Sequence, residues 1–258
     1  MTNQDILKTA MLQSSIDSHC EMEDFLSDQN KIVISAPHPQ ARKYLDLPFS
    51  CDLTSYGNNI VASVSADLAG PVQKYLDTYP VAHCFETPNM YVLNEEVKKH
   101  KACICFMAEY FLPDADIIQP LSCQYPTRLL EPNDFQSYYL PQWHNALSEQ
   151  RRHLDRMAIG AFDGGQLVGL AGCSADCDTM WQIGVDVLPA YRRQGIAAAL
   201  TSRLAVEILK REIVPFYCCA WSNIRSARNA IKSGFKPAWV QLTAKSIAFT
   251  STMNQPPE

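Results

Sequence analysis

The fold is decided by residues Ile183–Leu200, which read IGVDVLPAYRRQGIAAAL. An apolar strand ends at Pro189, a short basic turn follows, and Gly195 begins a helix rich in small residues. The first N–H groups of a helix have no partner within it and lie at the positive end of its dipole, so they suit an anion. Glycine at position 195 lets a phosphate approach the backbone closely, and Ala197 keeps that surface flat. The segment therefore predicts a phosphate-binding turn.

Charge and periodicity around the turn support the prediction. Arg192 and Arg193 stand where their guanidinium groups can reach phosphate oxygens. Beyond them, apolar residues recur every four positions, which predicts a helix packing face; they are Ile196, Leu200, Leu204 and Ile208. A bare Arg-x-x-Gly-x-Ala pattern more often marks an ordinary solvated loop before a helix. Its position between a long strand and a helix favours the phosphate site instead.

The elements on either side of the turn follow a regular order. We expect strands at 126–130, 157–162, 166–173, 180–188, 215–221 and 235–244, and helices at 195–211 and 223–233. Residues 131–155 are expected to form two helices broken at Pro141, and Asp163-Gly164-Gly165 to close a hairpin. This order predicts an α/β (α+β) fold for residues 125–258.

The first part of the chain predicts a second, smaller α/β domain. Helices are expected at 5–25, 67–79 and 94–100, and strands at 31–36, 59–64 and 102–111. Two prolines and two aspartates within residues 110–120 mark a change of composition, and we place the domain boundary at about residue 124, between 1–124 and 125–258. Residues 1–124 hold no glycine-rich loop, metal-ligand cluster or nucleophile elbow.

The overall composition limits the classes of partner. The chain has 258 residues, 47% of them hydrophobic and 19% charged, which is an ordinary globular balance. A formal charge of -5 disfavours nucleic acid as a partner. Cys173 and Cys177 have no second pair of ligands nearby, so no metal is predicted. The N-terminus lacks the pattern of a signal peptide and no long apolar run occurs, so we expect a cytoplasmic monomer or homodimer with no membrane partner.

At the turn the sequence resembles the GNAT superfamily of N-acetyltransferases. The hallmark of that superfamily, Arg/Gln-x-x-Gly-x-Gly/Ala, is matched by Arg192, Gly195 and Ala197. A second similarity is an Asn that begins the next helix, Asn223, and a Gly-Phe pair that closes it at Gly234. Both residues would also serve as ordinary helix caps. The resemblance covers about residues 125–245 and implies a GNAT-like mixed sheet, flanked by helices, that splays open between the strands near 185–188 and 215–221.

The resemblance implies a site for acetyl-CoA. The pyrophosphate of the co-substrate would lie at the turn, and its pantetheine would pair with the strand edge near residues 185 and 187. The residues implied for binding are Val185, Val187, Arg192, Arg193, Gln194, Gly195, Ile196, Ala197 and Asn223. The α/β pattern and size of residues 1–124 suggest a degenerate second copy of the same fold, although the phosphate turn is missing there.

The reaction implied by the resemblance needs two proton transfers. The acceptor amine must lose a proton before it attacks, and the leaving thiolate must gain one. The usual acid of the family, a Tyr four residues before the Gly of Gly-Phe, is replaced by Ala230. Either the thiolate leaves unprotonated or a residue elsewhere supplies the proton, and Tyr217 and Ser222 are the candidate acids. Asp186 is the candidate base, with a purely local hydrogen bond, a solvent-facing position, or a water relay in place of any dedicated base as the alternatives. A strand Tyr is also commonly part of a core.

We therefore predict an N-acyltransferase that moves an acetyl group from acetyl-CoA directly to a primary amine of a small molecule. One alternative is a protein or peptide N-acetyltransferase. Another is a non-catalytic acyl-CoA-binding sensor, which Ala230 favours. An interaction module without cofactor binding is disfavoured by the intact turn. Residues 131–155, the N-terminal half and the last strands are expected to shape the acceptor site.

Overall fold

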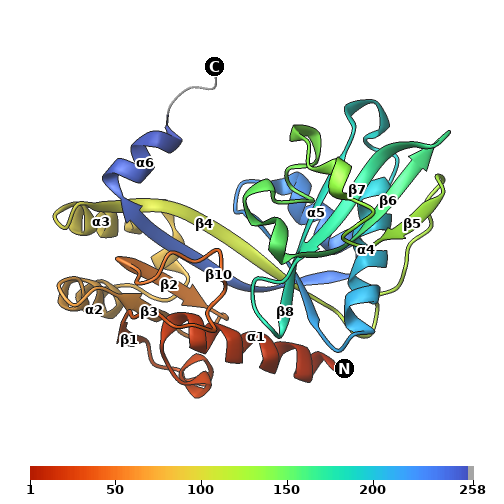
Figure 1. The fold of residues 1–258 in the computed structure, drawn as a ribbon. Coiled ribbons are helices and arrows are strands. Elements are labelled where there is room, and N and C mark those ends of the chain that lie inside the picture. The colour runs from red at the N-terminus through yellow and green to blue at the C-terminus, as the bar shows by residue number, and fades with distance from the viewer. Residues whose placement is uncertain (255–258) are drawn as a thin grey trace. The chain divides into compact units, whose positions relative to one another are not determined.

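The computed structural model describes residues 1–254, and the chain packs as two compact units (Figure 1). The first unit combines Met1–Ala10 with Tyr110–Ala238, and the second combines Met11–Glu109 with the described residues 239–254. Helix α1 (Asn3–Ser18) and strands β4 (Ala102–Pro113) and β10 (Phe235–Ser246) contribute residues to both. Each unit therefore draws on two separate stretches of sequence, and a domain boundary near residue 124 stays a prediction.

The first unit is built on a mixed sheet. Its strands are β5 (Thr127–Leu130), β6 (Asp155–Asp163), β7 (Gln166–Ser174), β8 (Met180–Val187) and β9 (Val214–Ala220), joined by the ends of β4 and β10. The order is β10-β4-β9-β8-β7-β6-β5, with β5 to β8 antiparallel and β8 parallel to β9. The predicted hairpin at Gly164-Gly165 is confirmed, since both glycines have positive φ and Asp163 pairs with Gln166.

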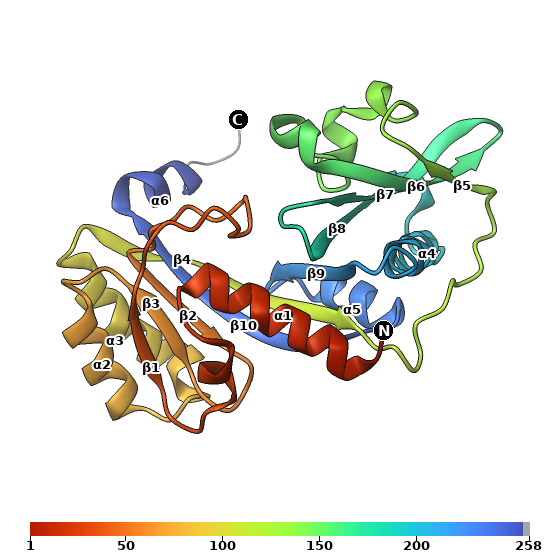
Figure 2. The same cartoon turned by 60° about the horizontal axis from the view of Figure 1, so that its bottom comes forward.

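Strands β8 and β9 pair over only part of their length. Their parallel register runs from Met180 opposite Val214 to Ile183 opposite Tyr217. Residues 184–187 of β8 continue to pair with β7 but, within the described chain, no longer with β9. The two strands therefore separate after Ile183 and Tyr217. Figure 2 shows β8 and β9 diverging. The splayed, GNAT-like sheet expected from the sequence is confirmed.

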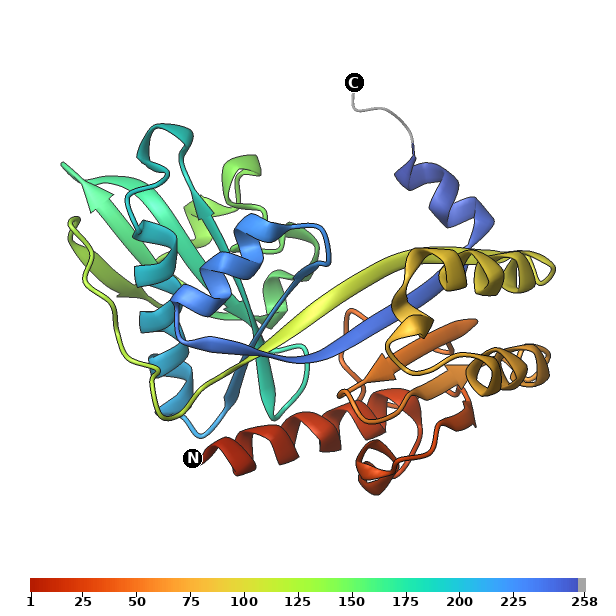
Figure 3. The same cartoon turned by 180° about the vertical axis from the view of Figure 1, so that it is seen from behind.

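Two helices cover the face of this sheet that is seen in Figure 3. Helix α4 (Ile196–Leu209) packs on β6, β7 and β8, and α5 (Ile224–Lys232) packs beside α4 and on β9. The predicted apolar stripe of α4 is buried in the core of the unit; its members are Ile196, Leu200, Leu204 and Ile208. The apolar pattern and the cations expected at its end, Lys210 and Arg211, together predicted this helix.

The expectation of two helices in residues 131–155 is wrong. The segment forms the short 3₁₀ helices η3 (Gln136–Tyr138), η4 (Pro141–Trp143) and η5 (Glu149–Leu154), joined by open loops. Residues 144–147 lie directly on the sheet: a Cβ at Gly172 would stand 2.1 Å from the carbonyl oxygen of Ala146, and one at Gly184 would stand 1.7 Å from that of Asn145. The side chains of an α-helix would prevent so close an approach of its backbone.

In the second unit the strands follow the order β1-β3-β2-β10-β4. Its further strands are β1 (Lys31–Ile34), β2 (Cys51–Ser55) and β3 (Val61–Val64), where β1 and β3 are parallel and β2 pairs antiparallel with β3 and β10. Helices α2 (Ala69–Thr78) and α3 (Thr87–Lys98) share one apolar core with β2, β3 and β10. Strand β2 was not predicted. The interpretation of residues 1–124 as a degenerate GNAT copy stays a prediction.

The remaining elements are short. They are the 3₁₀ helices η1 (Met22–Leu26), η2 (His83–Phe85) and η6 (Pro189–Tyr191), and the C-terminal helix α6 (Ile247–Met253). The expected helix at 5–25 ends at Ser18 and is followed by η1, and the expected helix at 94–100 begins earlier, at Thr87. None of the helices within residues 1–254 combines the length and the apolar character that a bilayer crossing requires.

Candidate acyl-CoA site

The turn between β8 and α4 has an unusual backbone. Arg193 has φ of 65° and Gly195 has φ of 81°, both in the left-handed region, and Gly195 is the residue that immediately precedes α4. A side chain at a left-handed position is strained, so glycine at 195 is explained by conformation as well as by access. The left-handed arginine is a second departure, of a kind that clusters at ligand sites.

This backbone leaves a run of N–H groups available. Ala199 is the first residue whose N–H donates within the helix, to the carbonyl oxygen of Gly195 at 3.1 Å. Within residues 1–254, the N–H groups of residues 194–198 meet no hydrogen-bond acceptor. They stand at the positive end of a 14-residue helix. The predicted anion-binding geometry is therefore present.

The turn opens onto a cavity of about 570 Å³ with a strongly basic lining. Its lining residues include Gly195, Ala197 and Val187, and also five cations, which are Arg192, Arg193, Arg225, Arg228 and Lys232. None of the described residues that line it is acidic. Such a concentration of positive charge in a chain with net charge -5 points to a multiply charged anion.

Three of these cations come from α5 and were missed in the sequence. Arg225, Arg228 and Lys232 follow the spacing i, i+3, i+7, which places them on one face of a helix. That spacing was a signal that could have found them. The ammonium of Lys232 would lie 3.9 Å from a Cβ at Gly195, so the two elements meet at the turn.

The residues predicted to bind the cofactor differ in which of their groups a ligand can reach. The Nε of Arg192 donates to the carbonyl oxygen of Val187 at 3.0 Å and ties the turn to the end of β8. Ile196 is 2% exposed, and its side chain belongs to the core, so its backbone N–H is the group it can present. Val185 is half-buried against the same core and does not line the basic cavity.

The side chains of Gln194 and Asn223 hydrogen-bond residues outside the basic cavity. The Oε1 of Gln194 accepts from the hydroxyl of Tyr125 at 2.9 Å and from the side chain of Gln124. The side chain of Asn223 accepts from the N–H of Ser226 at 3.2 Å and caps α5. The structure thus gives both side chains a structural contact, and their roles toward a cofactor stay predictions.

The three candidate catalytic residues contact different elements. The carboxylate of Asp186 accepts from the N–H groups of Asn145 (2.8 Å) and Ala146 (3.0 Å), and from the side-chain amide of Asn145 (2.7 Å). Tyr217 is 5% exposed in the core, its hydroxyl lies 2.8 Å from that of Ser226, and burial raises its pKa. Ser222 is exposed in the turn after β9. The structure does not gather them, and their catalytic roles stay predictions.

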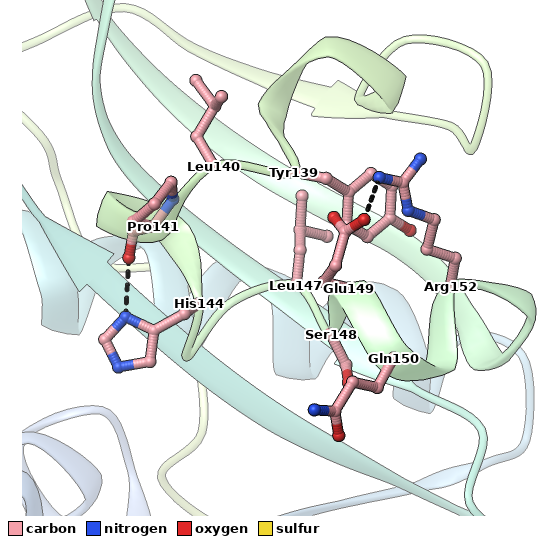
Figure 4. A pocket seen from close by; sticks show the side chains of 9 residues that line it. All are labelled: Tyr139, Leu140, Pro141, His144, Leu147, Ser148, Glu149, Gln150 and Arg152. Atoms are coloured by element: carbon pink, nitrogen blue, oxygen red, sulfur yellow. Dashed lines mark hydrogen bonds and ion pairs between the residues drawn. The ribbon is translucent and has the colours of Figure 1, made fainter.

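Two further cavities lie on the side of the sheet covered by residues 139–152. The outer one, of about 560 Å³, is shown in Figure 4. The inner one, of about 120 Å³, is lined by polar groups that include Asp155, a residue 4% exposed. Burial raises the pKa of Asp155 to about 6, although hydrogen bonds from the Ser148 N–H and the Tyr139 hydroxyl oppose the shift. The sequence carried no signal for Asp155, which it placed at the end of an expected helix.

Comparison with known proteins assigns the segment that contains this site to a protein family. Residues 121–235 match the model of the acetyltransferase (GNAT) family. This matched segment lies wholly within the first unit and contains the turn, α4 and α5. Residues 121–235 therefore form a GNAT acetyltransferase domain, as the turn and the Gly-Phe pair indicated, and the class of chemistry it supports is acyl transfer. No curated protein matches the chain.

Several solved structures are similar to the chain at low identity. A GCN5-related N-acetyltransferase-like protein from Streptococcus suis is 19% identical, with a TM-score of 0.45 over 62% of this chain and 68% of that one. An acetyltransferase from the GNAT family of Colwellia psychrerythraea is 14% identical, with a TM-score of 0.44 over 58% and 61%. A GCN5-related N-acetyltransferase from Sphaerobacter thermophilus is 13% identical, with a TM-score of 0.48 over 94% and 93%. This chain thus spans less than two thirds of the Colwellia protein that it matches.

Proposed function

We propose that the protein is an N-acyltransferase that moves an acetyl group from acetyl-CoA to a primary amine of a small molecule. The observation that carries the proposal is the basic cavity at the start of α4, where unpaired N–H groups and five cations meet. CoA carries a diphosphate and a ribose phosphate, so it matches both the helix terminus and the excess of positive charge.

The opening between β8 and β9 supports a path for the rest of the co-substrate. Residues 184–187 of β8 have one strand edge that β9 does not occupy. An extended pantetheine has amide groups that can hydrogen-bond such an edge. The path would run from the turn back along β8 and end where the strands rejoin, at Ile183 and Tyr217. The thioester would therefore lie near that junction.

The chemistry then follows from the position of the thioester. The amine nitrogen attacks the thioester carbonyl carbon, and the carbon–sulfur bond breaks as the amide forms. A main-chain N–H on the open edge of β8 near that junction would stabilise the developing oxyanion. The leaving thiolate takes a proton from Tyr217, Ser222 or water. Position 230 cannot supply that proton, because it is an alanine with no exposed surface.

The buried alanine also favours a second candidate, a non-catalytic acyl-CoA sensor. A protein or peptide acceptor is the remaining alternative. The deciding experiment measures free CoA thiol released from acetyl-CoA by purified protein against a panel of small primary amines and one lysine-containing peptide. Release that depends on a small amine supports the proposal. CoA binding by calorimetry without release from any acceptor would favour the sensor, and no CoA binding at all would overturn both.

A further inference from the structure

The inner cavity lies between an open loop and the sheet. Its roof is formed by residues 144–148, and its floor by Gly172, Gly184 and their neighbours on β7 and β8. Because both floor positions lack a side chain, the loop carbonyls sit on the strands and the remaining space is surrounded by polar groups. About 120 Å³ is room for about four water molecules at about 30 Å³ each, and also for an aminoethyl group.

The position of this cavity in the sheet relates it to the opening between β8 and β9. Asp155 pairs with Ser174 on β7, and Ser174 pairs with Gln182 on β8, so the three lie in one row across the sheet. Gln182 and Gly184 both line the cavity, and they flank Ile183, the last residue of β8 that pairs with β9. The cavity therefore abuts the junction where the proposed pantetheine path ends.

The carboxylate of Asp155 has one oxygen in use and one free for a ligand. Its Oδ2 accepts from the Tyr139 hydroxyl at 2.9 Å and from the Ser148 N–H at 3.1 Å. Its Oδ1 accepts no hydrogen bond from any residue in the described part of the chain. The nearby guanidinium of Arg151 is paired with Asp176. A buried carboxylate in a polar cavity with one free oxygen is suited to an ammonium group.

We propose that the inner cavity is the acceptor-amine site, and that Asp155 binds the ammonium of the acceptor and takes its proton. The inference rests on the proposed function and deepens it. The N–H bond of the ammonium breaks as the proton moves to Oδ1 of Asp155. The freed lone pair of the nitrogen forms the bond to the thioester carbon, and the thiolate leaves with the electron pair of the carbon–sulfur bond. The nitrogen still carries two hydrogens after the attack, and it loses one of them as a proton to water when the amide forms. The proton on Asp155 returns to water with the product.

The outer cavity indicates which kind of substituent the acceptor amine carries. It shares His144 and Ser148 with the inner cavity, so the two are adjacent. Leu140, Pro141 and Leu147 give it apolar surface (Figure 4). Its charged groups are already paired, because Arg152 bonds Glu149 and stands 4.2 Å from the ring centre of Tyr139. The acceptor class is therefore a primary amine on a compact apolar group, for which 2-phenylethylamine is a suitable probe.

The rate should depend on pH through Asp155. The carboxyl is neutral below its pKa of about 6 and becomes a base above it, so kcat/KM should rise with pH through about 6. The charged and titratable groups that face it are Tyr139, Arg151 and Asp176, with His144 across the cavity. His144 also lines the cavity; its Nδ1 contacts the carbonyl oxygen of Pro141 at 2.7 Å and leaves Nε2 free to act on a ligand. The test must therefore separate the two residues.

The experiment compares Asp155→Asn with a matched control, Asp178→Asn, which makes the same change at an exposed position of the β7–β8 turn. With acetyl-CoA and 2-phenylethylamine, Asp155→Asn should lower kcat/KM at least about 100-fold, remove the limb near pH 6 and leave CoA affinity unchanged. His144→Gln should keep the limb. Retention of the limb by Asp155→Asn, or its loss in His144→Gln, would overturn the assignment.

A second variant and a binding measurement keep the inference testable. Tyr139→Phe removes one hydrogen bond that lowers the pKa of Asp155, so the limb should move to higher pH; an unmoved limb counts against Asp155. If the wild type releases no thiol with any amine, the proposed function fails first. Calorimetry then decides the site itself. The wild type should bind 2-phenylethylamine more tightly than 2-phenylethanol, its neutral analogue, and Asp155→Asn should lose that preference. Equal binding of the two probes by the wild type would remove the amine site.

Discussion

Replacement of Gly195 by aspartate tests the phosphate turn most directly. A Cβ at this position meets no backbone atom within 4 Å, and its nearest neighbour is the Lys232 ammonium at 3.9 Å. The fold should therefore accept the new side chain at the cost of its left-handed backbone, about 1–2 kcal/mol, which lowers Tm by about 2–8 °C in a chain of this size.

The effect on binding should be much larger than the effect on stability. A carboxylate held about 4 Å from a phosphate is repelled by about 4 kcal/mol at an effective dielectric constant near 20. Since about 1.4 kcal/mol is a tenfold change in affinity, this corresponds to a loss of about 1,000-fold. Pairing of the new carboxylate with Lys232 offsets part of the repulsion, so we expect CoA to bind at least about 100-fold more weakly.

Isothermal titration with CoA measures the loss, and thermal unfolding measures the stability. The matched control is Gly165→Asp in the β6–β7 hairpin, where φ is also positive at 90° and nothing lies within 4 Å of a Cβ. It should carry the same strain and bind CoA normally. Wild-type affinity in Gly195→Asp, or an equal loss in Gly165→Asp, would refute the placement of the diphosphate.

Three further outcomes are expected. Lys232→Ala should weaken CoA binding by about 10-fold and make it less sensitive to salt, because a charge-assisted contact is lost. Calorimetric titration at two salt concentrations measures both effects. Unchanged affinity would exclude Lys232 from the site. Gly184→Ala should destabilise the fold by about 1–3 kcal/mol, since its Cβ would stand 1.7 Å from the Asn145 carbonyl oxygen; a Tm equal to that of the wild type would contradict the contact. Asp52 is buried, and burial raises its pKa to about 6, so the free energy of unfolding should fall as pH rises from about 4 through about 6. Urea unfolding at several pH values should show a shallower fall for Asp52→Asn than for the wild type. The same dependence on pH in both proteins would contradict the prediction.

Much of the fold could be predicted because it depends on local signals. The apolar stripe of α4 and the two glycines of the β6–β7 hairpin each lie within one short segment, where periodicity and turn chemistry act. The strands at 157–162, 166–173, 180–188, 215–221 and 235–244 are confirmed on the same grounds. The failure at residues 131–155 has a non-local cause, since the open loops there depend on glycines at 172 and 184, which are distant in sequence.

The candidate site also has one part that local sequence predicts and one part that it does not. The turn at Gly195 is a local structure, and its anion-binding character follows from helix termini alone. Asp155 becomes notable only when a loop covers it, its pKa rises through burial, and pairing across β7 places it in one row with Gln182. No spacing in the sequence records such a row, because strand register sets it.

The sequence by itself determined the strand–turn–helix at residues 183–200, the elements around it and the family resemblance, because hydrophobic period and glycine conformation are properties of neighbouring residues. Only the tertiary structure decided that three cations of α5 join the turn, that β8 and β9 separate after Ile183, and that a buried carboxylate lines a cavity that reaches that junction. These features depend on which distant segments pack together, and their energies come from burial and long-range pairing that no single segment contains.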